Sequence, residues 1–179
     1  ALVLDGSVSP SATDEQELLA QAQGFERTYA NFVAACDADP ACALGPDTAA
    51  AIDATRDRLA AEPVRVGSGS DARELGPDLF DLAVATALYD TTLWGTLAVS
   101  IAEVDDGGAS TLLSLVDRQT GRQPDGTYDN SSDAQTMVSC ADSDERPEVA
   151  DATAAAERIV AAAPTFGGIT AYGTLDCLG

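Results

Sequence analysis

The chain has 179 residues and a formal net charge of −21, and its nine basic residues are all Arg, with neither His nor Lys present. A Ser or Cys nucleophile needs a neighbouring base, nearly always His and sometimes Lys, so this chain on its own cannot run serine- or cysteine-type hydrolysis. The missing imidazole also excludes the common catalytic zinc sites, and the negative charge argues against nucleic acid and anionic membranes as partners.

Length and composition predict one mainly α domain over residues 1–179. A chain of this size buries enough surface for a hydrophobic core. Its apolar content is dominated by Ala, which favours closely packed helices. We expect six to seven helices, one short β-hairpin and a stub of an N-terminal strand. No apolar run approaches the length of a membrane-spanning helix, so we expect no membrane insertion.

The first residues form a short apolar run, Leu2-Val3-Leu4, which ends at Asp5-Gly6. This pattern is typical of a strand buried on both faces of a parallel sheet. Such a strand needs parallel neighbours, and nothing later in the chain offers them. We therefore expect the stub of a sheet whose other strands lie outside these residues.

Helical periodicity accounts for most of the remaining chain. Thr13 and Gln16 have capping-box spacing, and apolar residues then recur every three or four positions to about Cys36. Further helices are expected over about 47–61, 77–88, 91–104 (capped by Thr91 or Thr92), 110–118, 137–140 and 148–163, with a hairpin over 64–75. Residues 119–133 predict a long polar loop that is mobile or functional. The Gly-rich tail after Pro164 predicts no closing element.

The four cysteines are compatible with two disulfides in any of three connectivities. Pairing Cys36 with Cys42 and Cys140 with Cys177 costs least topologically. The short loop would contribute roughly 2 kcal/mol and the long loop roughly 4 kcal/mol to stability. Two bridges would place the chain in an oxidising compartment outside the cytosol. The alternative is four free, buried thiols.

Several fragments point together when they are taken in order. They are LVLDGSVSP at the start, FVAACDADPAC in 32–42, ALYDTTLWGTLA in 87–98, VSCADSDE in 138–145, and AAPTFG followed by Cys177. In this order they resemble the lid, or cap, region of secreted bacterial α/β-hydrolases of the tripeptidyl aminopeptidase-like family. The resemblance covers nearly the whole chain. One departure is Ser9, where the family commonly has an acidic residue before the proline.

The resemblance implies that the lid and the catalytic residues are separate parts of a longer polypeptide. In that family the nucleophile serine lies upstream in a Gly-x-Ser-x-Gly elbow, and the acid and histidine follow the lid. Residues 1–10 would then be a remnant of the hydrolase sheet and residues 11–179 the lid, with no catalytic residue and no cofactor in this chain. The implied partner is the catalytic core of the same secreted or cell-surface parent. The implied activity is that of an exopeptidase that removes short peptides from N-termini.

An enzyme of this kind must bind the ammonium group of a free N-terminus, which a partly buried carboxylate does well. Asp142, beside Cys140, is the first candidate, and Asp144 and Glu145 are its neighbours. Trp94 and Tyr89 are candidates for the pocket wall. The alternative is that the acids are solvated and that the two aromatic residues simply pack in the core.

Other interpretations remain open. The parent could be an esterase or lipase that acts on small esters rather than peptides. The chain could instead be a free-standing secreted helical binding module, and pairing of Leu2–Leu4 within a sheet made by this chain would favour that reading. A carboxylate-dependent enzyme such as a glycosidase needs two facing acids, and the spacing nominates no pair. The alternate acids at 37–39 and 142–145 fit no EF-hand loop, so we expect no metal site.

Overall fold

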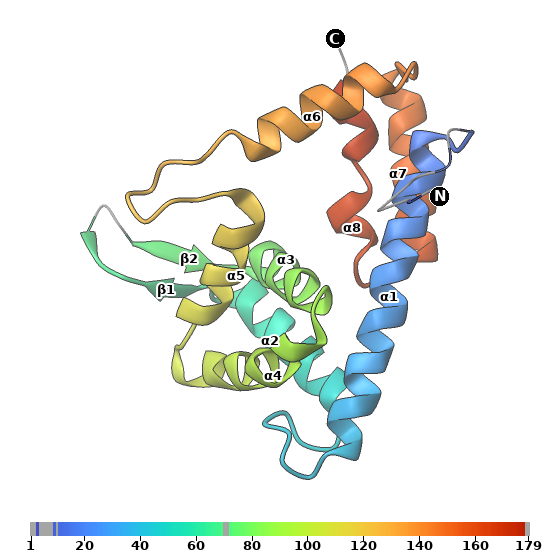
Figure 1. The fold of residues 1–179 in the computed structure, drawn as a ribbon. Helices are drawn as coiled ribbons and strands as arrows, with labels where there is room; N and C mark the ends of the chain where they lie inside the picture. Colours follow the sequence, from blue (N-terminus) through green and yellow to red (C-terminus); the bar gives the residue numbers. More distant parts are fainter. Residues whose placement is uncertain (1–2, 4–8, 10, 70–71, 178–179) are drawn as a thin grey trace. The chain divides into compact units, whose positions relative to one another are not determined.

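The structure, a computed structural model, describes residues 3, 9, 11–69 and 72–177. In these residues it is mainly helical, with a single two-stranded antiparallel hairpin, which confirms the predicted fold class (Figure 1). The predicted strand Leu2–Leu4 lies outside the described residues except for Val3, which is exposed and has no regular structure. None of the described helices combines the length and apolar content needed to span a bilayer.

The chain divides into two compact units. The first comprises Ala1–Glu26 with Gln135–Gly179, and the second comprises Arg27–Ala134. The division falls within α1 (Asp14–Ala38) and within α6 (Ser131–Asp142). The prediction of one domain over residues 1–179 stays a prediction.

The first unit contains the N-terminal half of α1, α7 (Val149–Ala162), α8 (Gly167–Thr170) and the 3₁₀-helix η4 (Gly173–Cys177). Helix α1 begins with the predicted capping box. The Gln16 N–H donates to Thr13 Oγ1 at 3.2 Å, and the Thr13 N–H donates to Gln16 Oε1 at 3.1 Å. The core of this unit is made largely of alanine: Ala22, Ala156, Ile159, Ala163 and Ala171 are buried, and Leu18 and Leu19 pack against them.

The prediction that the tail lacks a closing element was wrong for residues 167–177, which form α8 and η4. The cause is long-range packing on α1. Phe166 is fully buried, with its ring centroid 5.9 Å from that of Phe25. One carboxylate oxygen of Glu26 accepts hydrogen bonds from the N–H groups of Thr165 and Phe166, at 2.6 and 3.0 Å. The tail is thereby fixed to the first helix.

The second unit packs its helices around one central helix. Besides residues 27–38 of α1, it contains α2 (Thr48–Ala61), β1 (Val64–Val66), β2 (Arg73–Leu75), α3 (Pro77–Leu88), η2 (Thr91–Leu93), α4 (Trp94–Glu103), η3 (Val104–Asp106) and α5 (Ser110–Thr120). Helix α3 contacts α2, α4 and α5, and its residues Phe80, Ala83, Val84 and Ala87 are fully buried. Figure 1 shows α3 between its helical neighbours. Pro77 is in the first turn of α3, as expected.

The hairpin forms as predicted, with Val64 opposite Leu75 and Val66 opposite Arg73. Leu75 is fully buried. The Arg73 side chain extends from the hairpin to Asp117 of α5, and Arg73 Nη1 donates to Asp117 Oδ2 at 2.8 Å. The hairpin is therefore held to the helices by an apolar anchor and by an ion pair.

Two local details correct the sequence predictions. The side-chain cap is Asp90 rather than Thr91 or Thr92, and it caps η2, which leads into α4: the Asp90 carboxylate accepts from the N–H and the hydroxyl of Thr92, at 2.9 and 2.7 Å. Helix α6 is also much longer than the predicted 137–140. It starts at Ser131, inside the predicted loop, and the N–H and hydroxyl of Ser131 both donate to Asp129 just before the helix.

Candidate functional site

The structure pairs Cys36 with Cys42 and Cys140 with Cys177, with Cα atoms 5.4 and 5.2 Å apart. These are the pairs that the sequence analysis favoured, and no cysteine is free in the described chain. Two disulfides indicate an oxidising environment outside the cytosol.

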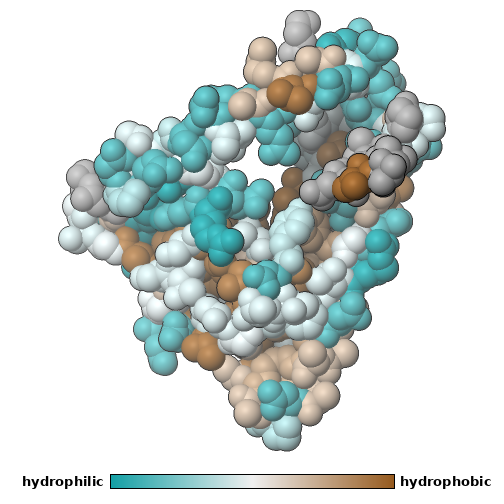
Figure 2. Space-filling view, viewed as in Figure 1, coloured by the Kyte–Doolittle hydropathy of each residue, from teal (hydrophilic) through white to brown (hydrophobic). Residues whose placement is uncertain are grey.

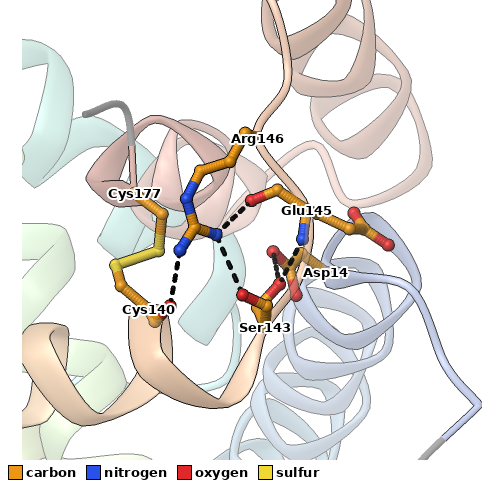
Figure 3. Close-up of a disulfide and its surroundings, with 6 residues drawn as sticks. All are labelled: Asp14, Cys140, Ser143, Glu145, Arg146 and Cys177. Carbon is orange, nitrogen blue, oxygen red and sulfur yellow. Dashed lines mark hydrogen bonds between the residues drawn. A yellow bond between two sulfur atoms is a disulfide. The ribbon is translucent and has the colours of Figure 1, made fainter.

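The segment after α6 is folded around the Cys140–Cys177 bridge, as Figure 3 shows. The Arg146 guanidinium donates to the carbonyl oxygens of Cys140, Ser143 and Glu145, at 2.8, 2.9 and 2.6 Å. It thereby satisfies the Cys140 carbonyl in the last turn of α6, which has no partner within the helix, and two carbonyls of the segment that follows the helix. The Ser143 hydroxyl donates to Asp14 Oδ2 at 2.9 Å, which connects this segment to the start of α1.

The candidates for the ammonium site lie on this segment. Asp142 is the last residue of α6, and Asp142, Asp144 and Glu145 are all exposed. The acid that receives a hydrogen bond here is Asp14, which the sequence analysis did not single out. The role of Asp142 and Asp144 in binding stays a prediction.

Trp94 and Tyr89 lie in the second unit. Trp94 is the first residue of α4, is half-buried and contacts Phe32 edge-on, with ring centroids 5.7 Å apart. Its Nε1 is shielded from solvent and has no hydrogen-bond partner among the described residues. Tyr89, at the end of α3, is 67% exposed. Core packing therefore accounts for one face of Trp94, and a role of either ring in a substrate pocket stays a prediction.

The acids at 37–39 have local structural partners. Asp37 Oδ1 accepts from the Thr48 N–H at 2.9 Å, which satisfies a backbone donor at the start of α2. Hydrogen bonds from the hydroxyl and N–H of Thr48 lower the pKa of Asp37. Asp39 Oδ1 accepts from the Ala41 N–H at 2.9 Å, within the loop closed by Cys36 and Cys42. In the part of the chain that the structure describes, no three Cys, Asp or Glu side chains gather as a metal site would require.

A pocket of about 510 Å³ lies in the second unit, at the C-terminal end of α5. Its walls include Asp117, Arg118, Gly121, Arg122, Gln123 and Asp129. It therefore lies at the predicted 119–133 loop, which turns back on itself through an isolated antiparallel bridge between Arg122 and Tyr128. None of the four predicted pocket residues is among the described residues that line it.

This pocket was not predicted from the sequence. The only available signal was a pair of arginines four residues apart, beside a Gly- and Pro-containing loop, in a chain that is otherwise strongly acidic. Figure 2 shows hydrophilic residues (teal) interspersed with residues of intermediate and high hydropathy on the face drawn there.

Comparison with known proteins found no family model that matches this chain. It is 34% identical over 158 residues to serine protease Hip1 of Mycobacterium tuberculosis and of Mycobacterium bovis, which covers 84% of this chain and 30% of that protein. It is also 34% identical over 168 residues to carboxylesterase B of Mycobacterium tuberculosis, which covers 92% of this chain and 32% of that protein. The chain thus spans about a third of the length of the curated relatives that it matches. It is a hydrolase-related protein.

Proposed function

We propose that the chain is the substrate-gating, pocket-forming lid of a serine hydrolase whose catalytic residues lie outside these 179 residues. Two observations carry the proposal: 84% of the chain matches only 30% of a serine protease, and the chain contains no His or Lys to activate a nucleophile. A lid narrows access to the nucleophile, excludes water and shapes the substrate pocket.

Helix α6 supports a role at a surface that is completed by another part of the protein. None of its described side chains is buried, and Met137 and Val138 are 71% and 60% exposed. An isolated helix of this length is marginal in water, because few backbone hydrogen bonds repay its nucleation. The Cys140–Cys177 bridge and the Arg146 contacts hold the end of the helix in place.

Within this function we favour an exopeptidase that removes short peptides from free N-termini and binds the substrate ammonium through Asp142 or Asp144. Exposed carboxylates bind an ammonium well only when another surface closes over them and excludes water. The catalytic core of the parent would supply that surface. An esterase acting on small esters is the second candidate, because the match to carboxylesterase B covers 92% of the chain.

A fluorophosphonate probe, which reacts with activated serines, tests whether the catalytic residues lie outside these 179 residues. The 179-residue chain should remain unlabelled. The longer polypeptide that joins it to a hydrolase core should be labelled at one serine. Stoichiometric labelling of the pure 179-residue chain would overturn the proposal. Replacing residues 11–177 by a short linker in the longer polypeptide should keep labelling but change substrate selection, and unchanged selection would rule out gating.

Substrates tested on the longer polypeptide distinguish the two activities. An exopeptidase should cleave a tripeptide fluorophore with a free N-terminus and should spare its acetylated form, whereas an esterase should prefer p-nitrophenyl butyrate. D142N and D144N should raise KM about tenfold for the free-amine substrate only, given the strength of a charge-assisted hydrogen bond. D133N, which removes an exposed acid from the first turn of α6, is the matched control. Equal effects of all three variants would remove Asp142 and Asp144 from the site.

A further inference from the structure

We propose that the pocket at the end of α5 binds the carboxylate of a small acid or of a peptide C-terminus through Arg118 and Arg122. The pocket lies wholly within the second unit, and no residue of the proposed ammonium site lines it. The inference therefore goes beyond the proposed lid function and does not depend on it.

The arginines of this chain differ in whether they contact a carboxylate. Five arginines have a carboxylate oxygen within 4.0 Å: Arg56, Arg58, Arg65, Arg73 and Arg158. Arg118 and Arg122 have none at that distance among the described residues, although both line the pocket. Asp90 and Asp125 attract them only at longer range. Arg27 and Arg146 also lack a carboxylate oxygen at that distance, but neither is among the described residues that line the pocket; Arg118 is exposed there and Arg122 is half-buried.

The two acids in the same wall already have partners. Asp117 faces Arg73 with both oxygens, each 2.8 Å from a guanidinium nitrogen, and its Oδ1 is shielded from solvent. Asp129 accepts from the N–H and hydroxyl of Ser131, and its other oxygen lies 3.5 Å from Gln123 Nε2. Asp117 is thus paired with Arg73, and Asp129 keeps its charge but contacts only neutral donors, so neither carboxylate forms an ion pair with Arg118 or Arg122.

The donors in the wall are in surplus. Arg118 makes no hydrogen bond that the described structure records, and Arg122 makes one long contact of 3.5 Å to the Gln123 carbonyl. Each guanidinium carries five N–H donors and no acceptor, so the pocket offers many donors to a ligand. A ligand that supplies only acceptors, such as a carboxylate, matches this surplus.

The geometry of the ligand group follows from the same residues. The planar fork of a guanidinium matches the two oxygens of a carboxylate. A singly charged anion also suits the site better than a phosphate dianion, because the net charge of −21 and the neighbouring Asp117 and Asp129 repel each added negative charge. A volume of about 510 Å³ is in the range of small-ligand pockets and can accept a side chain or a few residues beyond the carboxylate.

Titration of the 179-residue protein at low ionic strength tests the proposal. The probes are acetate, N-acetyl-tetraalanine with a free C-terminus, its C-terminal amide and inorganic phosphate. Binding is measured from the changes in the amide chemical shifts of residues 114–130. The free-acid peptide should bind, and the amide should bind at least about tenfold more weakly, since one charge-assisted contact is lost. If acetate binds as tightly as the peptide, the ligand is a small acid. If the peptide binds more tightly than acetate, the ligand is a peptide C-terminus. Either result supports the site.

Variants separate specific contacts from overall charge. R118Q and R122Q should each weaken binding of the free-acid peptide at least about fivefold. R65Q removes the same charge from the exposed hairpin of the same unit and should leave binding within about twofold. Far-UV circular dichroism establishes that each variant folds. No binding by the wild type, equal binding of acid and amide, tighter binding of phosphate, or an equal loss in R65Q would each overturn the proposal.

Discussion

Glu15 of α1 and Arg158 of α7 form a bidentate ion pair although 143 residues separate them. Arg158 Nε donates to Glu15 Oε1 and Arg158 Nη2 donates to Oε2, both at 2.7 Å. The hydrogen bond from Arg158 lowers the pKa of the Glu15 carboxyl below its ordinary value of 4.5. The pair joins the two helices on either side of the alanine core of the first unit.

This pair should make stability depend on pH in a defined direction. Because folding lowers the pKa of Glu15, its contribution is present above about pH 4.5 and is lost as the pH falls through the lower folded-state value. E15Q should therefore unfold at lower urea than the wild type at pH 7, and the two proteins should converge as the pH falls below 4.5. E17Q removes the same charge from the same turn without this pair. A gap between E15Q and the wild type that persists at pH 3 would contradict the assignment.

The core of the first unit should be sensitive to loss of volume at Ile159, which is fully buried in α7. I159A should lower the free energy of unfolding by about 2–5 kcal/mol, because the cavity cannot close completely. I169A removes the same atoms from a position of α8 that is 37% exposed, and it should cost about 1 kcal/mol. Urea denaturation followed by circular dichroism measures both. Similar losses in the two variants would place Ile159 outside the core.

The two disulfides should contribute unequally. Removing Cys140–Cys177, which spans 37 residues, as C140S/C177S should cost about 4 kcal/mol of unfolding free energy in the loop-entropy model. Removing Cys36–Cys42, which spans six, as C36S/C42S should cost about 2 kcal/mol. Denaturation of each variant under oxidising conditions makes the comparison. If the short bridge proves the more important, the structure of the loop that it closes matters more than chain entropy.

Gly121 should be the least replaceable glycine at the pocket. Its φ of +70° places it in the left-handed region at the end of α5, and a Cβ there would meet the Asp129 carboxylate. G107A is the control, because Gly107 has a φ of +79° and open space around its Cα. G107A should cost about 1–2 kcal/mol from backbone strain alone, and G121A should cost more. Equal losses in thermal or urea unfolding would show that Asp129 moves aside freely.

Short-range sequence signals correctly predicted the elements that are specified by neighbouring residues. The capping box of Thr13 and Gln16, Pro77 at the start of α3 and the hairpin at 64–75 all form as expected, because the residues that specify them lie within a few positions of one another. The cysteine pairing was favoured correctly because the least costly loops were also the native ones.

The elements that sequence reasoning missed depend on partners far along the chain. Helix α6 has no buried side chain, so it shows no apolar periodicity from which to predict its length. The tail folds because Phe166 is buried and because Glu26, 140 residues earlier, binds its backbone. The pocket also depends on a residue far along the chain. Asp117, next to Arg118 in the sequence, pairs instead with Arg73, 44 residues away, and this leaves Arg118 without a contacting carboxylate.

The alanine core of the first unit has a consequence for how this protein tolerates change. Ala22, Ala156, Ala163 and Ala171 are all within 1% of full burial, so at these four positions a single methyl group fills the space available beside Ile159. Such a contact has little side-chain volume to lose and almost no room to gain any. Enlarging residues there should therefore do more harm than trimming them, and homologous chains should drift freely at the surface while these positions remain small.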